Sequence, residues 1–225
     1  MNKAFSMLVV ALLIAVPALG TSSASDLERV VENVQRTYER AREFHASFEQ
    51  TAEIKALEKV QKSKGEVWFK KPGKMRWNYY TPNRDEIVSD GSTFWQYDHE
   101  EKQVVETSIE RVISTQGTTT FLQGLGKIKE QFNASFPTKE HRDAKGNYLV
   151  DLSPKDDSGD EVNRFTIVVD PKSWIVSAIF LYDPFNNKTI VNFSNIEINK
   201  GISDSVFKFK IPKGVEVIKA PPLIR

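Results

Sequence analysis

Residues that commonly carry catalysis or hold metals are sparse in this chain and far apart. The three histidines, His45, His99 and His141, are isolated from one another, and none lies in an H-E-x-x-H motif. The chain has no cysteine, so the usual zinc sets and any disulfide are excluded. We interpret each histidine as an ordinary strand or turn position, and we predict no metal and no cofactor.

Nucleophile and acid–base motifs are equally scarce. The sequence has no G-x-S-x-G motif and no glycine-rich phosphate loop. The adjacent carboxylates Glu100-Glu101 and Asp156-Asp157 fall in expected hairpin turns, where charge favours contact with water. A hydrolase with paired carboxylates stays open because its pair need not be close in sequence, but nothing favours it. We therefore predict no catalytic residue and no enzyme activity.

The most informative stretch runs from Gly65 to Tyr97 and holds three of the four tryptophans. Short aromatic or β-branched runs separated by turn clusters predict consecutive antiparallel strands. The turn clusters are Lys71-Pro72-Gly73, Thr81-Pro82-Asn83 and Ser89-Asp90-Gly91-Ser92.

Side chains alternate between the two faces of a strand. Met75, Trp77 and Tyr79 should therefore share one face, and Thr93, Trp95 and Tyr97 should lie together in the next hairpin. The pattern predicts a sheet with one broad aromatic face. That face either forms the protein's own core or lines a pocket for an apolar ligand.

The elements around this stretch can be predicted in order. Ser25 and Glu28 form an S-x-x-E capping box before apolar residues at helical spacing, which predicts a helix at about 26–43. Alternation from Phe44 through Phe48 opens a first strand toward Ile54, and the charged segment 56–64 is interpreted as a hairpin tip.

Further strands follow on both sides of a helical insert at 108–125. Two short helices joined by glycine cannot form a domain of their own, so we interpret this insert as a lid. The predicted fold is mainly β with a few α-helices: one large, strongly curved antiparallel sheet with helices on its concave side. The strands are expected at about 65–71, 74–80, 85–89, 93–98, 102–107, 132–136, 148–152, 162–169, 174–182, 188–198 and 207–211.

The N-terminus has the features of a secretory signal peptide. Lys3 precedes an apolar segment, Met7 to Val16, which is too short to span a bilayer. Cleavage after Gly20 or Ser25 is expected, with Ser25 preferred, which gives a signal peptide at 1–25 and a single domain at 26–225. Without Lys3 the basic and acidic residues are equal in number, which argues against nucleic-acid binding and against strong adhesion to anionic lipid.

Several motifs, in order, resemble the periplasmic outer-membrane lipoprotein carrier (LolA) family over essentially the whole mature chain. They are Phe44 to Gln50 (FHASFEQ), Gly65 to Pro72 (GEVWFKKP), Met75-Arg76-Trp77 and Ile87 to Gly91 (IVSDG). The resemblance implies an unclosed β-barrel with a helical lid over an apolar cavity that holds lipoprotein acyl chains. It also implies a periplasmic location, cargo received from an inner-membrane ABC transporter, and delivery to an outer-membrane receptor lipoprotein. The absence of an acylatable cysteine favours the soluble carrier over the receptor, and we expect a monomer.

The aromatic pattern and the resemblance together give a set of candidate site residues. The family commonly has an arginine in its W-x-K-R-P motif that ties the lid; here Lys71 stands at that position, so we expect a looser latch or one shared with Arg76. The expected cavity residues are Phe48, Met75, Trp77, Tyr79, Trp95, Phe121 and Leu122.

Two other classes of function remain open from the sequence. The same fold could serve as a sensor or assembly factor that recognises envelope lipids or proteins. The aromatic face could also bind sugars, which would require exposed tryptophans.

Overall fold

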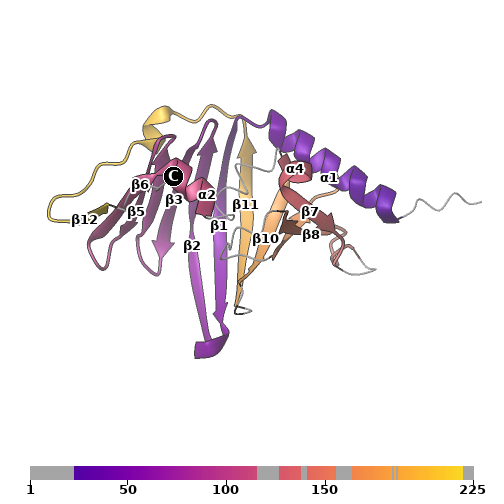
Figure 1. Cartoon of the computed structure of the whole chain (residues 1–225), viewed down its shortest axis with the longest axis horizontal. Helices are drawn as coiled ribbons and strands as arrows, with labels where there is room; N and C mark the ends of the chain where they lie inside the picture. Colours follow the sequence, from indigo (N-terminus) through magenta and orange to yellow (C-terminus); the bar gives the residue numbers. More distant parts are fainter. Residues whose placement is uncertain are drawn as a thin grey trace, which may run out of the picture.

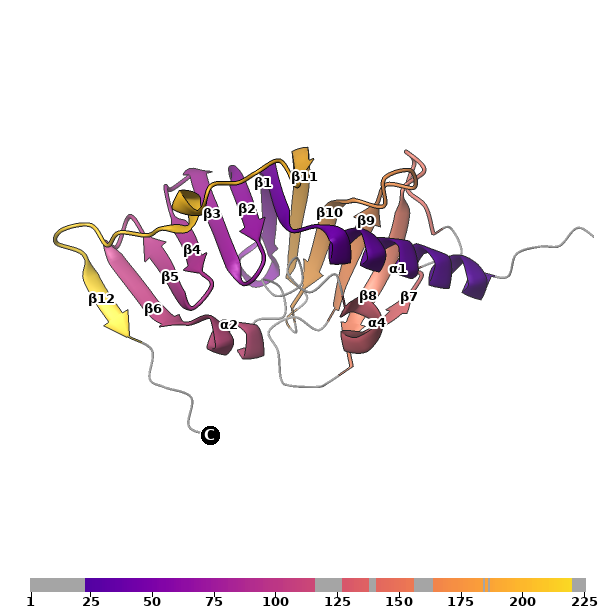
Figure 2. The same ribbon diagram turned by 90° about the horizontal axis from the view of Figure 1, so that it is seen from above.

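The computed structural model describes residues 23–115, 127–137, 141–155, 164–183, 185 and 187–219. These residues form a 12-stranded sheet in the order β12-β6-β5-β4-β3-β2-β1-β11-β10-β9-β8-β7. All neighbouring pairs are antiparallel except β12 and β6. Figure 1 shows the strands side by side, and Figure 2 shows that the sheet curves as an open arc.

From β2 to β6 the strands are joined by tight turns, as the turn clusters predict. In the first half they are β1 (Glu43–Ile54), β2 (Lys59–Lys70), β3 (Lys74–Thr81), β4 (Glu86–Asp90), β5 (Thr93–Asp98) and β6 (Gln103–Ser108). In the second half they are β7 (Phe132–Ser135), β8 (Tyr148–Pro154), β9 (Arg164–Val169), β10 (Val176–Tyr182), β11 (Lys188–Ile198) and β12 (Glu216–Lys219).

The helices lie on the concave side of the arc, where one apolar stripe of α1 faces the sheet (Figure 2). They are α1 (Ser23–Arg40), α2 (Ile109–Thr115) and α4 (Ile128–Gln131). Two 3-10 turns lie elsewhere: η1 (Lys55–Leu57) joins β1 to β2, and η3 (Asp204–Phe207) follows β11. None of the helices in the described ranges is both long enough and apolar enough to cross a bilayer. The prediction of an unclosed, curved, mainly β fold with helices on the concave face is confirmed.

Two predictions of secondary structure were wrong. The segment 56–64 is not a loose tip: β2 begins at Lys59 and pairs with β1 as far as Ile54. This part of the hairpin extends beyond the rest of the sheet, so little of it is buried and it lacks the alternation that identifies a half-buried strand. The segment predicted as strand 207–211 is not a strand, because η3 ends at Phe207 and residues 208–211 belong to no helix or strand. The last strand is β12, whose four residues are all exposed.

The signal-peptide prediction and most of the predicted lid lie outside the described residues. Within the lid, Ile109–Thr115 forms the helix α2.

Candidate site: the apolar face of the sheet

The candidate site is the concave face of the sheet, which strand register makes continuous and apolar. Residues paired across an antiparallel ladder share a face, so one pairing places Phe48 beside Gly65 and the next places Gly65 beside Tyr79. Trp77 pairs with Val67 in the same way. The face continues through β11, β10, β9 and β8 with Phe193, Val191, Ile179, Ile167 and Val150.

Trp77 lies at the centre of an aromatic cluster on this face. Its ring centroid is 4.9 Å from that of Phe48, 6.1 Å from Phe69 and 6.4 Å from Phe193, and the first two pairs are edge-to-face. This spacing is favourable for aromatic pairs. Phe48 also contacts Tyr79 at 5.1 Å, and burial raises the pKa of Tyr79 to about 12.

The indole N–H of Trp77 is buried and has no hydrogen-bond acceptor within the described part of the chain. Leaving a buried donor unsatisfied costs about 1–3 kcal/mol. An acceptor group brought in by a ligand would remove that cost. A carbonyl oxygen has the chemistry for this bond, while a hydrocarbon chain suits the surrounding rings.

Helices cover the face. Val30, Val34 and Tyr38 of α1 are buried in the same cluster as Phe48 and Trp77, together with Ile109 and Val112 of α2. The backbone N–H of Val176 donates to the Tyr38 hydroxyl at 3.0 Å, which ties α1 to the start of β10. Helices therefore cover part of the apolar face, with α1 against β7 and α2 against β5 and β6.

A cavity of about 300 Å³ remains at the edge of this cover, between the end of α1 and the β2–β3 turn. Its apolar walls include Tyr38, Ala41, Phe44 and Phe69, and Lys71 lies at its rim. This volume is at the lower end of the range for small-molecule pockets, so several long acyl chains require the helical cover to move.

Lys71 fastens the end of α1. Its ammonium donates to the carbonyl oxygens of Tyr38 at 2.7 Å and Glu39 at 3.3 Å, in the last turn of the helix. A cation is favourable there because the helix dipole places partial negative charge at that end. Partial burial lowers the pKa of Lys71. The described contacts thus make Lys71 a latch for α1; whether it also holds the lid stays a prediction.

Arg76 does not share this latch, contrary to expectation. It lies on the opposite, convex face, where its guanidinium donates to the carbonyl oxygens of Val206 at 3.1 Å and Lys208 at 3.4 Å and pairs with Glu86. Alternation along β3 explains this, because Met75 and Trp77 occupy the concave face.

The placement of Trp95 on the apolar face was also wrong. In the β4–β5 pair, Ser89, the partner of Met75, lies opposite Phe94, so Phe94 takes the concave face and Trp95 the convex one. Trp95 packs on Phe209 at 5.7 Å, and its N–H donates to Glu106 at 3.1 Å. Phe94 is absent from the predicted set, and counting register across the β4–β5 turn would have found it. Phe69 and Phe193, which pack on Trp77, are absent from that set too.

The other predicted cavity residues fall into two groups. The structure brings Phe48, Met75, Trp77 and Tyr79 together on the concave face, where Met75 is 0% exposed. Phe121 and Leu122 lie outside the described residues, and their role stays a prediction.

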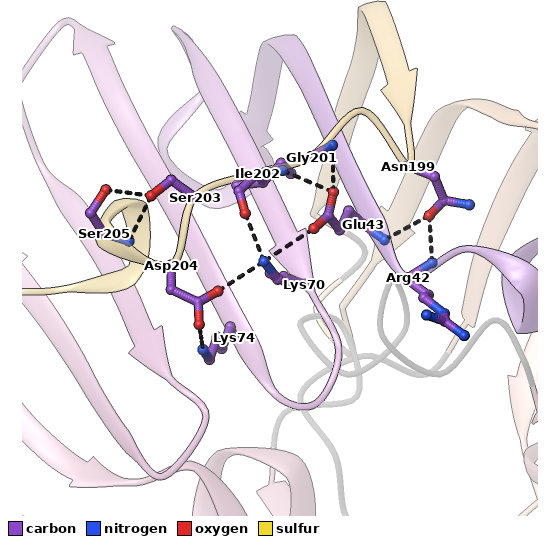
Figure 3. Close-up of polar contacts among 10 residues, drawn as sticks. All are labelled: Arg42, Glu43, Lys70, Lys74, Asn199, Gly201, Ile202, Ser203, Asp204 and Ser205. Atoms are coloured by element: carbon purple, nitrogen blue, oxygen red, sulfur yellow. Dashed lines mark hydrogen bonds and ion pairs between the residues drawn. The ribbon is translucent and has the colours of Figure 1, made fainter.

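The convex face is held by a polar network that the sequence did not reveal. A C-terminal strap, residues 199–209, crosses this face from β11 toward the far edge of the sheet (Figures 1 and 3). Glu43 accepts hydrogen bonds from the backbone N–H groups of Gly201 at 2.8 Å and Ile202 at 2.9 Å. Lys70 reaches Glu43 at 3.1 Å and Asp204 at 2.8 Å, and Lys74 also reaches Asp204 at 2.8 Å.

These contacts shift the acidity of both carboxyls. The hydrogen bonds from Lys70 and Lys74 lower the pKa of Asp204 to about 2. Backbone and lysine donors also lower the pKa of Glu43. The strap is thus fastened by charge, while the other face is covered by apolar packing.

No group of three or more potential metal-ligating side chains comes together in the described residues. His45, which the sequence left as an ordinary strand position, stacks on Trp68 with centroids 5.0 Å apart. Its ring nitrogens lie 3.1 Å from Glu66 and 3.3 Å from Glu197 on the convex side.

A curved, unclosed sheet with helices over an aromatic concave face is the architecture of an apolar-ligand carrier. The family model described as "Outer membrane lipoprotein carrier protein LolA" matches residues 39–210, and the chain belongs to this family.

Relatives named "Outer-membrane lipoprotein carrier protein" match over nearly their whole lengths. The relative from Nitrosomonas europaea is 30% identical, covering 84% of this chain and 88% of its own. The relative from Serratia proteamaculans is 31% identical, covering 87% of this chain and 91% of its own. The relative from Azotobacter vinelandii is 27% identical, covering 92% of this chain and 97% of its own.

A solved structure of an uncharacterized conserved protein from Thermus thermophilus superposes with a TM-score of 0.55 at 10% identity. It covers 87% of this chain and 99% of that one. At this identity the likeness shows the fold alone.

Proposed function

We propose that this protein carries acylated lipoproteins and holds their acyl chains against the concave face. The observation that carries the proposal is the continuous apolar surface from β3 to β8, with the aromatic cluster around Trp77 at its β3 end. Family membership supplies the class of cargo. Since Trp77 is only 9% exposed, the face does not present the open tryptophan platform that sugar binding would need.

The energetics require exchange between apolar surroundings and not capture from water. Each methylene moved out of water contributes about 0.8 kcal/mol. Three chains of roughly 15 methylenes would total about 36 kcal/mol, beyond the practical limit of about 20 kcal/mol for non-covalent affinity. A carrier can release such chains only if it takes them from, and returns them to, similarly apolar sites.

Loading then exchanges one apolar cover for another. In the empty protein α1 and α2 pack on the concave face; acyl chains displace part of this cover and occupy the same surface. Lys71 keeps the end of α1 in place through its hydrogen bonds to Tyr38 and Glu39, so we expect α2 and the segment that follows it to move. The Trp77 N–H donates to an ester or amide carbonyl of the cargo.

A pair of tryptophans on opposite faces provides a matched test. Trp77→Glu places a charge on the concave face, and Trp95→Glu places one on the convex face. After expression in the periplasm, lipoproteins that co-purify are identified by mass spectrometry. We expect the Trp77 variant to lose cargo and the Trp95 variant to retain it, with folding checked by circular dichroism. Equal cargo on a folded Trp77 variant would contradict the proposal.

A second measurement needs no variant. A diacylated lipopeptide with photoactivatable acyl chains is bound to the unaltered protein, and the adducts are mapped by peptide sequencing. Adducts at Phe48, Trp77 or Phe193 support the concave site. Adducts confined to Trp95 or Phe209 would place the chains on the convex face and refute it.

The role of the indole N–H has its own test. Trp77→Phe removes the donor and keeps an aromatic ring. We expect it to weaken binding of a diacyl glycerol lipopeptide by about tenfold, since one buried hydrogen bond contributes about 1 kcal/mol or more. Binding of the dialkyl-ether analogue, which has no ester carbonyl, should change less. Equal losses for both would assign the effect to packing.

The partners follow from the same proposal. We propose that the carrier works as a monomer in the periplasm, without a catalytic step. It receives cargo from an inner-membrane ABC transporter and delivers it to an outer-membrane receptor lipoprotein. Family membership supports this route, and reconstitution of transfer between purified transporter and receptor, with and without this chain, tests it.

A further inference from the structure

A projecting part of the molecule exposes apolar side chains far from the concave face. Among the described residues, three of the large apolar side chains that are exposed lie at one end of the sheet: Leu57 at 69%, Val60 at 57% and Phe185 at 82%. Leu57 and Val60 belong to the end of the β1–β2 hairpin, and Phe185 to the turn between β10 and β11. Figure 1 shows both turns at the lower end of the sheet, with the hairpin extending furthest.

The two turns form one surface. Glu53 pairs with Lys188 across β1 and β11, which brings the bases of the turns together. The backbone N–H of Lys55 donates to the side-chain oxygen of Asn187 at 2.9 Å. Asp183 accepts from the backbone N–H groups of Phe185 and Asn187, at 2.9 and 2.8 Å, so it orders the turn that presents Phe185. We name this surface, residues 55–64 with Phe185, the basic finger.

Its charge is strongly one-sided although the whole chain is nearly neutral. Between residues 55 and 64 there are four lysines, Lys55, Lys59, Lys62 and Lys64, and a single carboxylate, Glu58. Lys64 pairs with Glu49 at 2.7 Å in an exposed position, where such pairs are weak and screened by salt. Two carboxylates outside this range border the apolar residues: Glu53 pairs with Val60, and Asp183 lies in the turn that carries Phe185. The finger is thus an apolar tip with an excess of cations.

We propose that the basic finger docks on the surface of bilayers that contain anionic phospholipid, with Leu57, Val60 and Phe185 in the interfacial layer. Apolar side chains flanked by lysines suit this boundary, because the apolar groups enter it and the ammonium groups remain at the headgroups. Each lysine near an anionic surface contributes about fivefold in affinity. Three apolar side chains in the interfacial layer give weak, reversible docking and not permanent anchoring.

This surface goes beyond the carrier function and does not depend on it. A lipid surface is favoured over a protein groove because the exposed apolar groups lie on two turns at one projecting end of the sheet, where lysines outnumber carboxylates. The overall neutrality that argues against adhesion of the whole protein does not apply to a charge confined to one hairpin.

The absence of cysteine allows a direct test with the full chain. Leu57→Cys and, as the control, Val217→Cys on the exposed strand β12 are each labelled with an environment-sensitive dye. The empty protein is mixed with vesicles of phosphatidylcholine alone or with phosphatidylglycerol added. We expect the dye at position 57 to shift to shorter wavelength only with the anionic vesicles, and the dye at position 217 to stay unchanged.

Co-sedimentation with the same vesicles measures the two contributions. Replacing Leu57, Val60 and Phe185 by Ser should lower vesicle binding at least tenfold, while Val217→Ser with Ile218→Ser should not. Replacing Lys55, Lys59 and Lys62 by Gln should lower it about a hundredfold, as should high salt.

Three outcomes would overturn the proposal: no spectral shift at position 57 with either vesicle, equal shifts at positions 57 and 217, or binding unaffected by the Ser and Gln replacements. Because cargo is absent from these assays, a failure here is separate from a failure of the carrier proposal.

Discussion

The two faces of the sheet are held by different forces. On the concave face, helices cover rings and aliphatic side chains, and the Trp77 N–H lacks an acceptor in the described residues. On the convex face, a C-terminal strap is fastened by Glu43, Lys70 and Asp204 at hydrogen-bond distances. Apolar contact is non-directional, so its partner can be exchanged for another apolar group. The hydrogen-bonded ion network is directional and holds one geometry.

This difference suits a carrier. The face that must exchange its cover has contacts that an acyl chain can replace at little cost. On the opposite face, directional contacts of Glu43, Lys70 and Lys74 hold the strap to the ends of β1, β2 and β3. Substitutions on one face at a time test whether the two faces are held by different forces.

The largest effect is expected at Gly65, on the concave side where β2 and β3 approach closely. A Cβ at this position would lie 1.9 Å from the Asn78 carbonyl oxygen and 2.8 Å from the Phe48 ring. We expect Gly65→Ala to cost more than about 4 kcal/mol, because a backbone atom must move. The control is Gly201→Ala in the strap, where φ is +89° but nothing lies within 4 Å. It should cost about 1–2 kcal/mol. Urea denaturation measures the free energy of unfolding of both variants. Equal losses would contradict the close approach of β2 and β3 at Gly65.

The next largest difference is expected between two neighbouring residues of β3, Met75 and Lys74. Met75 is fully buried on the concave face, so Met75→Ala should cost about 2–5 kcal/mol of unfolding free energy. Lys74 points to the convex face and pairs with Asp204, and Lys74→Ala should cost no more than about 1 kcal/mol. Thermal unfolding followed by circular dichroism tests this, and a reversed order would show that the core does not lie on the concave face.

Lys71 combines the two kinds of contact, because its charged ammonium holds the end of a helix that packs on the apolar face. Lys71→Met removes the donors to Tyr38 and Glu39, and we expect a loss of about 0.5–1 kcal/mol at this exposed position. Lys71→Arg keeps the cation and should restore most of it. Hydrogen exchange in the last turn of α1 measures the effect. Equal protection in all three proteins would remove the latch role.

The smallest effect concerns the strap and acid. Asp204 has a pKa of about 2 in the folded protein against an ordinary 3.8. Its contribution is therefore present above about pH 4 and is lost as pH falls toward 2. The pKa of Glu43 is lowered too, so its contribution is lost in the same direction. Protection of the Gly201 and Ile202 amides should fall in this window while amides of β2 remain protected. Asp204→Asn should weaken the dependence, and pH-independent protection in the native protein would refute it.

Strands with one buried face could be predicted from the sequence. The alternation at Phe44, Ala46 and Phe48 and at Met75, Trp77 and Tyr79 reflects burial on one side, and the turn residues mark where each strand ends. The prediction failed where burial is absent, as at Lys59–Lys64 and Glu216–Lys219, because exposed strands have no periodic apolar pattern.

The site was predicted only within single strands. Alternation places Met75 with Trp77, but it cannot relate β3 to β5, and Trp95 proved to lie on the other face. A shift of one residue in pairing moves every side chain of a strand across the sheet, so the shared face depends on turn geometry that composition does not specify.

The sequence alone determined the mainly β class, the apolar side of strands such as β1 and β3 that bury one face, and the absence of disulfides, because these depend on local pattern and residue type. Only the tertiary structure decided which strands share the concave face, that Lys71 holds α1, and that Glu43 and Lys70 clasp a segment more than a hundred residues away. Such contacts join groups distant along the chain, and their formation depends on the register and curvature of the whole sheet.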